Sequence, residues 1–387
     1  MRNKISWLRS WLLLSLSLCA SSATLAQDRS LVDGISLPDG FSISVWTDKV
    51  PNARSLALGE SGTVFVSTRS NDKIYAVIPR EVGEPDVVEI ASGLRTPNGI
   101  DLLDGDLYVA ETERLLRFPD IEQHLNEDAP FEVVADDFPP ERHHGWRYIR
   151  FGPDGKLYMS VGAPCNVCDR DGFATILRMN PDGSNREVWA SGVRNSVGLE
   201  FHPVTGELWF TDNGRDMLGD DLPPGELNHA PAAGAHFGFP FCHAGVVADP
   251  EFGGQRACSE FRSPAMALGP HVAPLGLQFY DGDQFPEEYR GDVFIAEHGS
   301  WNRSERIGYR VTRVRLDGPS PSYEVFASGW LKNEQVSGRP VDLLILADGS
   351  MLVSDDHAGR IYRITYTLPG MDSTTIPGPP AVRRLNR

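Results

Sequence analysis

Two adjacent histidines, His143 and His144, stand in a polar segment of this 387-residue chain that packing alone would not require. His144 lies eight residues before Gly152, which opens a Gly-Pro-Asp-Gly turn. A histidine has a pKa close to neutral, so it can take a proton from a substrate as a general base. The sequence therefore makes His144 a candidate base, with a histidine that only caps a strand end as the alternative.

A second polar segment is rich in groups that recognise anions and cations. Arg194 can present a planar pair of N–H groups to a carboxylate, and Asn195 can both donate and accept hydrogen bonds. The turn at 211–216, with Asp221 and Glu226 close behind, offers the hard oxygen ligands that Ca²⁺ prefers. The spacing does not match an EF-hand loop, and a solvated turn is the alternative.

Arginines recur in two further polar segments nearer the end of the chain. Arg303 and Arg306 follow a His-Gly-Ser-Trp-Asn sequence, and Arg339 precedes a proline. If several of these arginines face one point, the ligand there is an anion with more than one carboxylate. The alternative is that they pair with surface acids, where ion pairs contribute little to stability.

A repeated unit separates these segments and must position them. An apolar strand, a turn rich in Gly and Asp and a second strand recur six times, with first strands that begin at Leu56, Ile100, Ile149, Leu199, Leu277 and Leu343. A spacing of about 40–50 residues is typical of propeller blades, which bury their faces against each other. The sequence therefore predicts an all-β fold, a six-bladed β-propeller over residues 37–366. The alternating segment 42–46 is expected to complete blade six.

The N-terminus has the pattern of an export signal. Residues 1–26 combine three basic residues with a short apolar run and end in Ala26, as in a cleaved signal peptide. An uncleaved anchor and a lipoprotein modified at Cys19 are the alternatives. We expect a periplasmic or secreted protein with no membrane insertion after cleavage. The net charge of −17, which cleavage makes more negative, argues against nucleic acid as a partner.

Four cysteines remain after cleavage. Cys165 and Cys168 form a Cys-x-x-Cys pair, and Cys242 and Cys258 lie in a long segment between the fourth and fifth repeats. In an oxidising compartment the simplest interpretation is two disulfides, Cys165 with Cys168 and Cys242 with Cys258. A redox-active Cys-x-x-Cys pair and a zinc site that uses Cys242 and His243 are the alternatives.

Two segments interrupt or follow the repeats. The spacing widens over residues 218–274, which predicts an insertion. Long ordered loops in compact domains usually carry function. The run 367–387 is polar, rich in proline and without period, so it predicts a disordered tail.

At these motifs the chain resembles the soluble glucose/sorbosone dehydrogenase family, and most closely its sorbosone-dehydrogenase-like branch. The resemblance rests on Gly-x-Arg-Asn-x-x-Gly-Leu, on the histidine before the Gly-Pro-Asp-Gly turn and on His-Gly-Ser-Trp-Asn-Arg, and it covers about residues 37–366. Members of this family are six-bladed propellers that bind pyrroloquinoline quinone (PQQ) and Ca²⁺.

The resemblance implies roles for individual residues. It makes His144 the catalytic base. The residues implied to bind PQQ are Arg194, Asn195, Arg339 and either Arg303 or Arg306, which would replace a lysine of the family. The residues implied to hold Ca²⁺ are Gly214 and Arg215, through their backbone carbonyls, with Asp221 and Glu226 as looser counterparts of the family's acids.

The chain departs from the family's better-known sugar dehydrogenases at three positions. His143 stands where they have an aspartate, Ala163 where they have another acid, and Val341 where they have a second arginine. These departures leave PQQ as the expected cofactor and bear mainly on substrate and rate.

The function that the resemblance implies is oxidation of a sugar. A hydride would pass from a sugar hydroxyl or aldehyde to PQQ bound to Ca²⁺, with an electron acceptor as a further partner. One alternative is a Ca²⁺-dependent, lactonase-like propeller hydrolase, whose metal would be held by carboxylates at the axis. The other is a propeller that only binds, because a fold does not fix a function.

Overall fold

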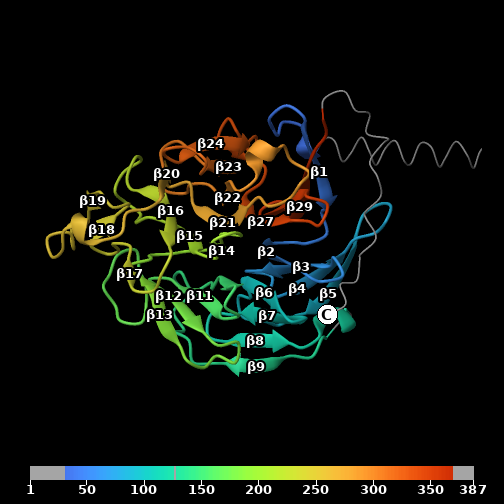
Figure 1. The fold of residues 1–387 in the computed structure, drawn as a ribbon, viewed down its shortest axis with the longest axis horizontal. Coiled ribbons are helices and arrows are strands. Elements are labelled where there is room, and N and C mark those ends of the chain that lie inside the picture. The colour runs from blue at the N-terminus through green and yellow to red at the C-terminus, as the bar shows by residue number, and fades with distance from the viewer. Residues whose placement is uncertain (1–30, 126–127, 369–387) are drawn as a thin grey trace, which may run out of the picture.

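Six small antiparallel sheets form a ring in the computed structural model, which describes residues 31–125 and 128–368 (Figure 1). The predicted all-β, six-bladed propeller is confirmed. The predicted signal peptide at 1–26 and most of the predicted tail at 367–387 lie outside the described residues. In the described ranges no helix is both long enough and apolar enough to cross a membrane.

Blades one to three follow one another along the chain. Blade one consists of β2 (Ala53–Leu58), β3 (Val64–Thr68), β4 (Ile74–Ile78) and β5 (Asp86–Ala91). Blade two consists of β6 (Gly99–Leu103), β7 (Asp106–Ala110), β8 (Leu115–Phe118) and β9 (Glu132–Ala135), with the 3-10 helix η1 (Ile121–Gln123) before β9. Blade three consists of β10 (Ile149–Phe151), β11 (Leu157–Val161), β12 (Thr175–Met179) and β13 (Glu187–Ser191).

Blades four to six complete the ring. Blade four consists of β14 (Leu199–Phe201), β15 (Leu208–Asp212), β16 (Pro224–Ala230) and β20 (Met266–Pro270). Blade five consists of β21 (Pro274–Phe279), β22 (Val293–Glu297), β23 (Arg310–Arg315) and β24 (Ser322–Ala327), with η3 (Glu287–Tyr289) before β22. Blade six consists of β27 (Pro340–Ile345), β28 (Met351–Asp355), β29 (Arg360–Tyr366) and β1 (Phe41–Thr47). A hairpin of β25 (Leu331–Lys332) and β26 (Gln335–Val336) precedes blade six.

The ring is closed by an early strand, as the sequence predicts. β1 pairs antiparallel with β29, from Phe41 opposite Tyr366 to Thr47 opposite Ile361. In Figure 1 the blue β1 and the red β29 lie side by side. A propeller built this way leaves no gap between its first and last blades, because both ends of the chain contribute to one sheet.

The hydrophobic core lies between neighbouring blades. Phe65 and Ile74 of blade one pack in one cluster with Ile100 and Leu107 of blade two. All residues of the second strand of blade three, β11, are buried, and so are those of β15 in blade four. These inner strands therefore read as apolar runs without strict alternation, because they are covered on both faces.

The predicted insertion has narrower bounds than the sequence suggested. Residues 218–274 contain β16 and β20, the two outer strands of blade four, so only the residues between these strands are additional. The additional part contains β17 (Ala235–His236), β18 (Cys242–His243), β19 (Val247–Ala248) and the 3-10 helix η2 (Cys258–Glu260). β17 pairs parallel with β13 and adds a fifth strand to blade three. The insertion thus links blades three and four.

Both predicted disulfides are confirmed. Cys165 is bonded to Cys168, and Cys242 is bonded to Cys258. The second bond closes the additional segment between blades three and four. With all four sulfurs paired, the structure does not support the alternative zinc site that would use Cys242.

Candidate cofactor cavity at the centre of the propeller

A cavity of about 360 Å³ lies at the centre of the ring. Its wall takes residues from blades one, three, four, five and six, so side chains that are distant in the sequence meet there. The predicted site residues on this wall are His144, Arg194, Asn195, Gly214 and Arg339. All of the polar segments identified in the sequence contribute to it.

His144 reaches the cavity from the segment before β10. Its ring atom Nδ1 lies 2.8 Å from the carbonyl oxygen of Ala163. A carbonyl only accepts hydrogen bonds, so Nδ1 carries the proton and Nε2 keeps its lone pair. No described residue forms a hydrogen bond with Nε2. This nitrogen is therefore free to accept a proton from a ligand in the cavity.

The neighbouring strand fixes the position of His144. The backbone φ of His144 is 50°, in the left-handed region. A Cβ added to Gly162, just after β11, would lie only 2.6 Å from the Cβ of His144, so the close approach requires glycine. Burial and the charge of Arg194 lower the pKa of His144 to about 2, which keeps the imidazole neutral. Ala163, which replaces an acid of the family, still orients the ring through its backbone carbonyl.

Arg194 and Asn195 precede β14 and are held by the end of β15. Asp212 accepts the backbone N–H of Arg194 at 2.8 Å with Oδ2, and that of Asn195 at 2.6 Å with Oδ1. The side-chain amide of Asn195 has no hydrogen-bond partner among the described residues and faces the cavity. Asn195 therefore fits its predicted role as a ligand-binding amide.

The sequence suggested that Arg194 presents free N–H groups to a ligand carboxylate, but in the structure these groups already have partners. Its N–H groups donate to the carbonyl oxygens of Asn166, Asn213 and Gly214 and to the side chains of Asn166 and Asp216, at distances between 2.8 and 3.0 Å. Asn166 lies within the loop that the Cys165–Cys168 disulfide closes. Arg194 is therefore a fixed part of the wall whose donors the protein already uses.

The predicted calcium ligands begin with Gly214 and Arg215, which lie just after β15. The carbonyl oxygen of Gly214 faces Arg194 and accepts its Nη1–H at 2.8 Å. The side chain of Arg215 turns away from the cavity and pairs with the buried carboxylate of Asp249 in the insertion. Of the two, only Gly214 lies on the cavity wall.

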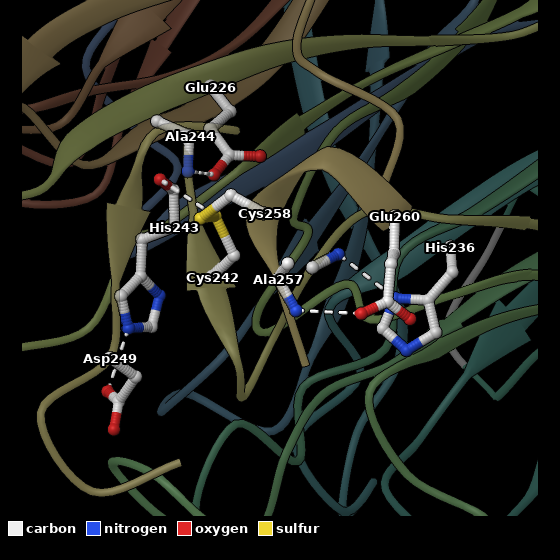
Figure 2. Close-up of a disulfide and its surroundings, with 10 residues drawn as sticks. Glu226, His236, Cys242, His243, Ala244, Asp249, Ala257, Cys258 and Glu260 are labelled. Carbon is white, nitrogen blue, oxygen red and sulfur yellow. Dashed lines mark hydrogen bonds and ion pairs between the residues drawn. A yellow bond between two sulfur atoms is a disulfide. The ribbon is translucent and has the colours of Figure 1, made fainter. Parts of the chain in front are cut away.

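The acidic members of the predicted calcium set lie elsewhere. The side chain of Asp221 is 88% exposed and pairs with Arg303 at 3.6 Å. Glu226 lies on β16 opposite Asp212, is buried behind the wall and accepts the N–H of Ala244 at 2.7 Å (Figure 2). In the described ranges no group of three or more His, Cys, Asp or Glu side chains is placed to hold a metal. The predicted calcium set is thus not assembled, because sequence proximity in this turn does not produce a common direction.

Figure 2 shows how the insertion contacts Glu226, which lies on β16 behind the cavity wall. The Cys242–Cys258 bond lies beside Ala244, whose N–H binds Glu226. The ring of the neighbouring His243 contacts Asp249 through Nε2 at 2.9 Å. The disulfide-closed segment is therefore tied to β16.

The predicted cofactor arginine of blade six is placed as expected, but the one of blade five is not. Arg339 lies on the cavity wall, where Nε and Nη2 donate to the carbonyls of His298 and Gly299 at 2.9 Å. Arg303 lies outside the cavity and its Nε donates to the carbonyl of Glu305. Arg306 also lies outside, with its guanidinium on the backbone of Glu334. Partners outside the cavity bind both arginines, so neither takes the place implied for the family's lysine.

Cationic residues of blade one, which the sequence analysis missed, complete the wall. Arg54 is buried and pairs with Asp356 at 3.0 Å, and Asp356 also contacts His298 Nε2 at 2.8 Å. Arg69 lies over the ring of Trp146 at 4.9 Å and has no acidic partner within the described residues. Both arginines sit in or next to the repeated strands of blade one, so only their position near the axis distinguishes them from surface arginines.

The wall as a whole is strongly cationic. Arg54, Arg69, Arg194 and Arg339 line it, against a single carboxylate among the described lining residues, Asp216. Burial lowers the pKa of Arg69, and the charge of Arg54 lowers it further. A planar tricarboxylate such as PQQ fits this donor set, because it would supply the negative charge that the arginines lack. The residues present fit PQQ, and of the predicted calcium ligands Gly214 is the one found among the described lining residues.

Comparison with known proteins gives a family for this chain. A family model described as Glucose / Sorbosone dehydrogenase matches residues 116–302. An uncharacterized protein of Borreliella burgdorferi is 33% identical over 363 residues, which cover 89% of this chain and 94% of that protein. The aldose sugar dehydrogenase YliI of Escherichia coli is 27% identical over 117 residues, 29% of each chain.

Solved structures support the fold. The holo form of the PQQ domain of pyranose dehydrogenase from Coprinopsis cinerea superposes with a TM-score of 0.72 at 17% identity, covering 86% of this chain and 97% of that domain. This likeness agrees with the six blades. The chain belongs to the glucose/sorbosone dehydrogenase family.

Proposed function

We propose that this protein is a PQQ-dependent oxidoreductase that oxidises a hydroxyl or aldehyde group of a sugar in the central cavity. The observation that carries the proposal is His144, whose Nε2 is a free base on a cavity wall lined by four arginines. A general base and a polyanion site in one cavity suit a quinone cofactor and an alcohol substrate. The fungal relative with a similar fold is a pyranose dehydrogenase in its holo form, which agrees with this choice.

The protein's own residues would divide the work as follows. Arg69 and Arg339 would bind the carboxylates of the cofactor, and the amide of Asn195 would bind a further polar group of it. When bound, PQQ supplies the acceptor of the hydride. His144 Nε2 would take the proton of the sugar hydroxyl while the C–H hydride leaves the same carbon, so that a carbonyl forms. Base assistance of this kind is typically worth about 10²–10⁴-fold in rate.

Two tryptophans would bind the sugar beside His144. Trp146 stands edge-on to His144, with ring centres 6.3 Å apart, and Trp301 lies on the cavity wall with 67% of its surface exposed. Aromatic rings offer apolar faces together with polar edges, which suits sugar rings. We assign no step to Ca²⁺. The Gly214 carbonyl accepts one hydrogen bond from Arg194 and keeps a second lone pair for an ion held together with the cofactor.

The lactonase alternative is disfavoured by the charge of the wall. A calcium-dependent hydrolase needs several carboxylates at the axis. Among the described lining residues Asp216 is the only carboxylate. The binding-only alternative does not account for a histidine whose tautomer is fixed with the free nitrogen toward the cavity. Export to the periplasm or the medium, and a separate electron acceptor, remain parts of this proposal.

Reconstitution tests the proposal directly. PQQ is added to the purified protein with and without Ca²⁺, and cofactor binding is followed by its absorbance and by calorimetry. Reduction of an artificial electron-accepting dye is then measured with a panel of aldoses. We expect stoichiometric PQQ binding and dye reduction that depends on both PQQ and sugar. Absence of PQQ binding under both conditions would exclude the proposed function.

A further inference from the structure

A second cavity of about 610 Å³ adjoins the central one. It lies over blades one, two and three, and it shares Arg69 and Trp146 with the central cavity. The two cavities therefore meet at this pair of side chains, in which the guanidinium of Arg69 lies over the indole ring. A ligand that passes Trp146 can occupy both.

The second cavity carries more positive than negative charge. Arg69, Arg95 and Arg142 line it, against the acids Asp72 and Glu113. Glu113 is already paired with Arg95, at 3.4 Å. This surplus occurs in a protein whose formal net charge is −17, so it is not a consequence of overall composition.

Two of these arginines have donors to spare. The guanidinium of Arg142 is exposed, and no described residue forms a hydrogen bond or ion pair with it. Arg69 is partly buried, lacks an acidic partner in the described ranges and is repelled by Arg54, which helps lower its pKa. An arginine fork without a protein partner is suited to a carboxylate or a phosphate.

We propose that the second cavity binds an anionic group on the sugar unit adjacent to the one that is oxidised. The inference rests on the proposed function, since it takes the reacting unit to lie beside His144, and it names the substrate class as an acidic disaccharide or longer acidic saccharide. The neighbouring unit crosses Trp146 and places its carboxylate or phosphate at Arg142, which lines the second cavity alone, while Arg69 holds the cofactor. The central cavity alone would accept the reacting unit, and the second cavity selects its neighbour.

Binding measurements on the PQQ-loaded protein test this assignment without requiring turnover. Calorimetry at low ionic strength compares cellobiose with cellobiouronic acid and with cellobiose phosphorylated on its non-reducing unit. We expect at least one of the two anionic disaccharides to bind about tenfold more tightly than cellobiose, and salt to reduce the difference. The anion that gains more identifies whether the site favours carboxylate or phosphate.

Arg142→Gln is the matched variant, because its side chain touches neither His144 nor the central cavity. It should weaken binding of the preferred anion about three- to tenfold and leave cellobiose unaffected. Arg80→Gln, which removes an exposed arginine paired with Asp86 outside both cavities, should change neither affinity. Equal affinity for neutral and anionic disaccharides, or a preference that survives Arg142→Gln, would overturn the inference. A preference for the anion without any dye reduction would support this site and reject the oxidoreductase.

Discussion

Arg194 and Arg69, on two sides of the central cavity, use their guanidinium groups in opposite ways. On the blade-four side, formed by Arg194, Asn195 and Gly214, the protein occupies the arginine's N–H groups with carbonyls and carboxylates of its own. On the blade-one side, formed by Arg54 and Arg69 together with Arg339, Arg69 has no acidic partner among the described residues. The first side is thus preorganised before any ligand arrives, while the second side holds charge that a ligand would neutralise.

The difference suggests a division of labour. A fixed wall costs no reorganisation at the moment of reaction and suits the residues that orient the reacting atoms. A wall of under-neutralised cations loses stability to repulsion but gains affinity for an anion. The base, His144, packs against the fixed side, and the proposed cofactor carboxylates would meet the cationic side.

The largest effect is expected at the base on the fixed side. His144→Ala should lower kcat by about 10²–10⁴-fold while PQQ still binds, because the imidazole takes the proton but lies away from the cationic side. Steady-state kinetics measures the loss of kcat, and calorimetry of the same preparation measures PQQ binding. His143→Ala is the matched control and should lose much less. A larger loss at His143 would assign the base to the neighbouring residue.

Substitution of Arg194 and of Arg69 is the most direct test of the difference between the two sides of the cavity. Arg194→Ala should lower the free energy of unfolding by about 3 kcal/mol, because several buried carbonyls and Asp216 lose their donor. Arg69→Ala should leave the free energy of unfolding unchanged or raise it slightly, since it removes repulsion with Arg54, yet it should weaken PQQ binding about tenfold or more. Denaturant unfolding of the apo-protein and calorimetry with PQQ report the two quantities. Equal destabilisation by both substitutions would mean that the two sides do not differ.

Removal of the disulfide behind the fixed side should have a smaller effect. Replacement of Cys242 and Cys258 by serine should lower the free energy of unfolding by about 3 kcal/mol or less, as expected from chain entropy for a loop of this length. The same replacement at Cys165 and Cys168 should cost less stability but should disturb the loop that holds Arg194. Thermal unfolding and PQQ affinity of the two double variants distinguish these outcomes. The reverse pattern would show that the insertion does not support the wall.

The smallest effect per residue concerns the pH dependence of stability. Burial lowers the pKa of His144 to about 2 and that of His298 to about 4, from an ordinary value of 6.5. The unfolded chain binds protons at these positions below pH 6.5 whereas the folded chain does not, so the free energy of unfolding falls as the pH drops below 6.5.

Each histidine should account for about 1 kcal/mol between neutral pH and roughly one unit below the ordinary value. Denaturant titrations of His144→Gln and His298→Gln across this range should each show a shallower pH dependence than the parent protein. A slope unchanged in both variants would show that folding does not lower the pKa of either histidine.

Local patterns were enough to predict the propeller and part of the site. The six repeats and the closing strand follow from apolar strands and turns, which are short-range features of the sequence. His144, Asn195 and Arg339 could be placed because each stands in the short segment that leads into the first strand of a blade, near the central cavity.

The remaining site residues depend on side-chain directions that no local pattern contains. Arg303 and Arg339 look alike in the sequence, but Arg303 is bound outside the cavity by the carbonyl of Glu305 and by Asp221 of the blade-four turn. Glu226 lies on the same face of β16 as Asn228, whose side-chain amide donates to its carboxylate. It is buried there, whereas the predicted role required a side chain at the axis. Arg69 follows a strand of blade one without any accompanying motif, and only its proximity to Trp146 in three dimensions reveals its role.

The closure of blade six has a consequence for how the chain can assemble. β1 is the first strand of the propeller, and its partner β29 appears roughly 300 residues later. Bringing the ends of such a segment together costs on the order of 5 kcal/mol in loop-closure entropy, and until then the uncharged strand Phe41–Thr47 has no partner along its backbone. An unpaired apolar strand edge is a template for pairing with another chain. During synthesis, the nascent chain therefore carries a risk of aggregation at this first strand, and that risk ends only when the last strand arrives.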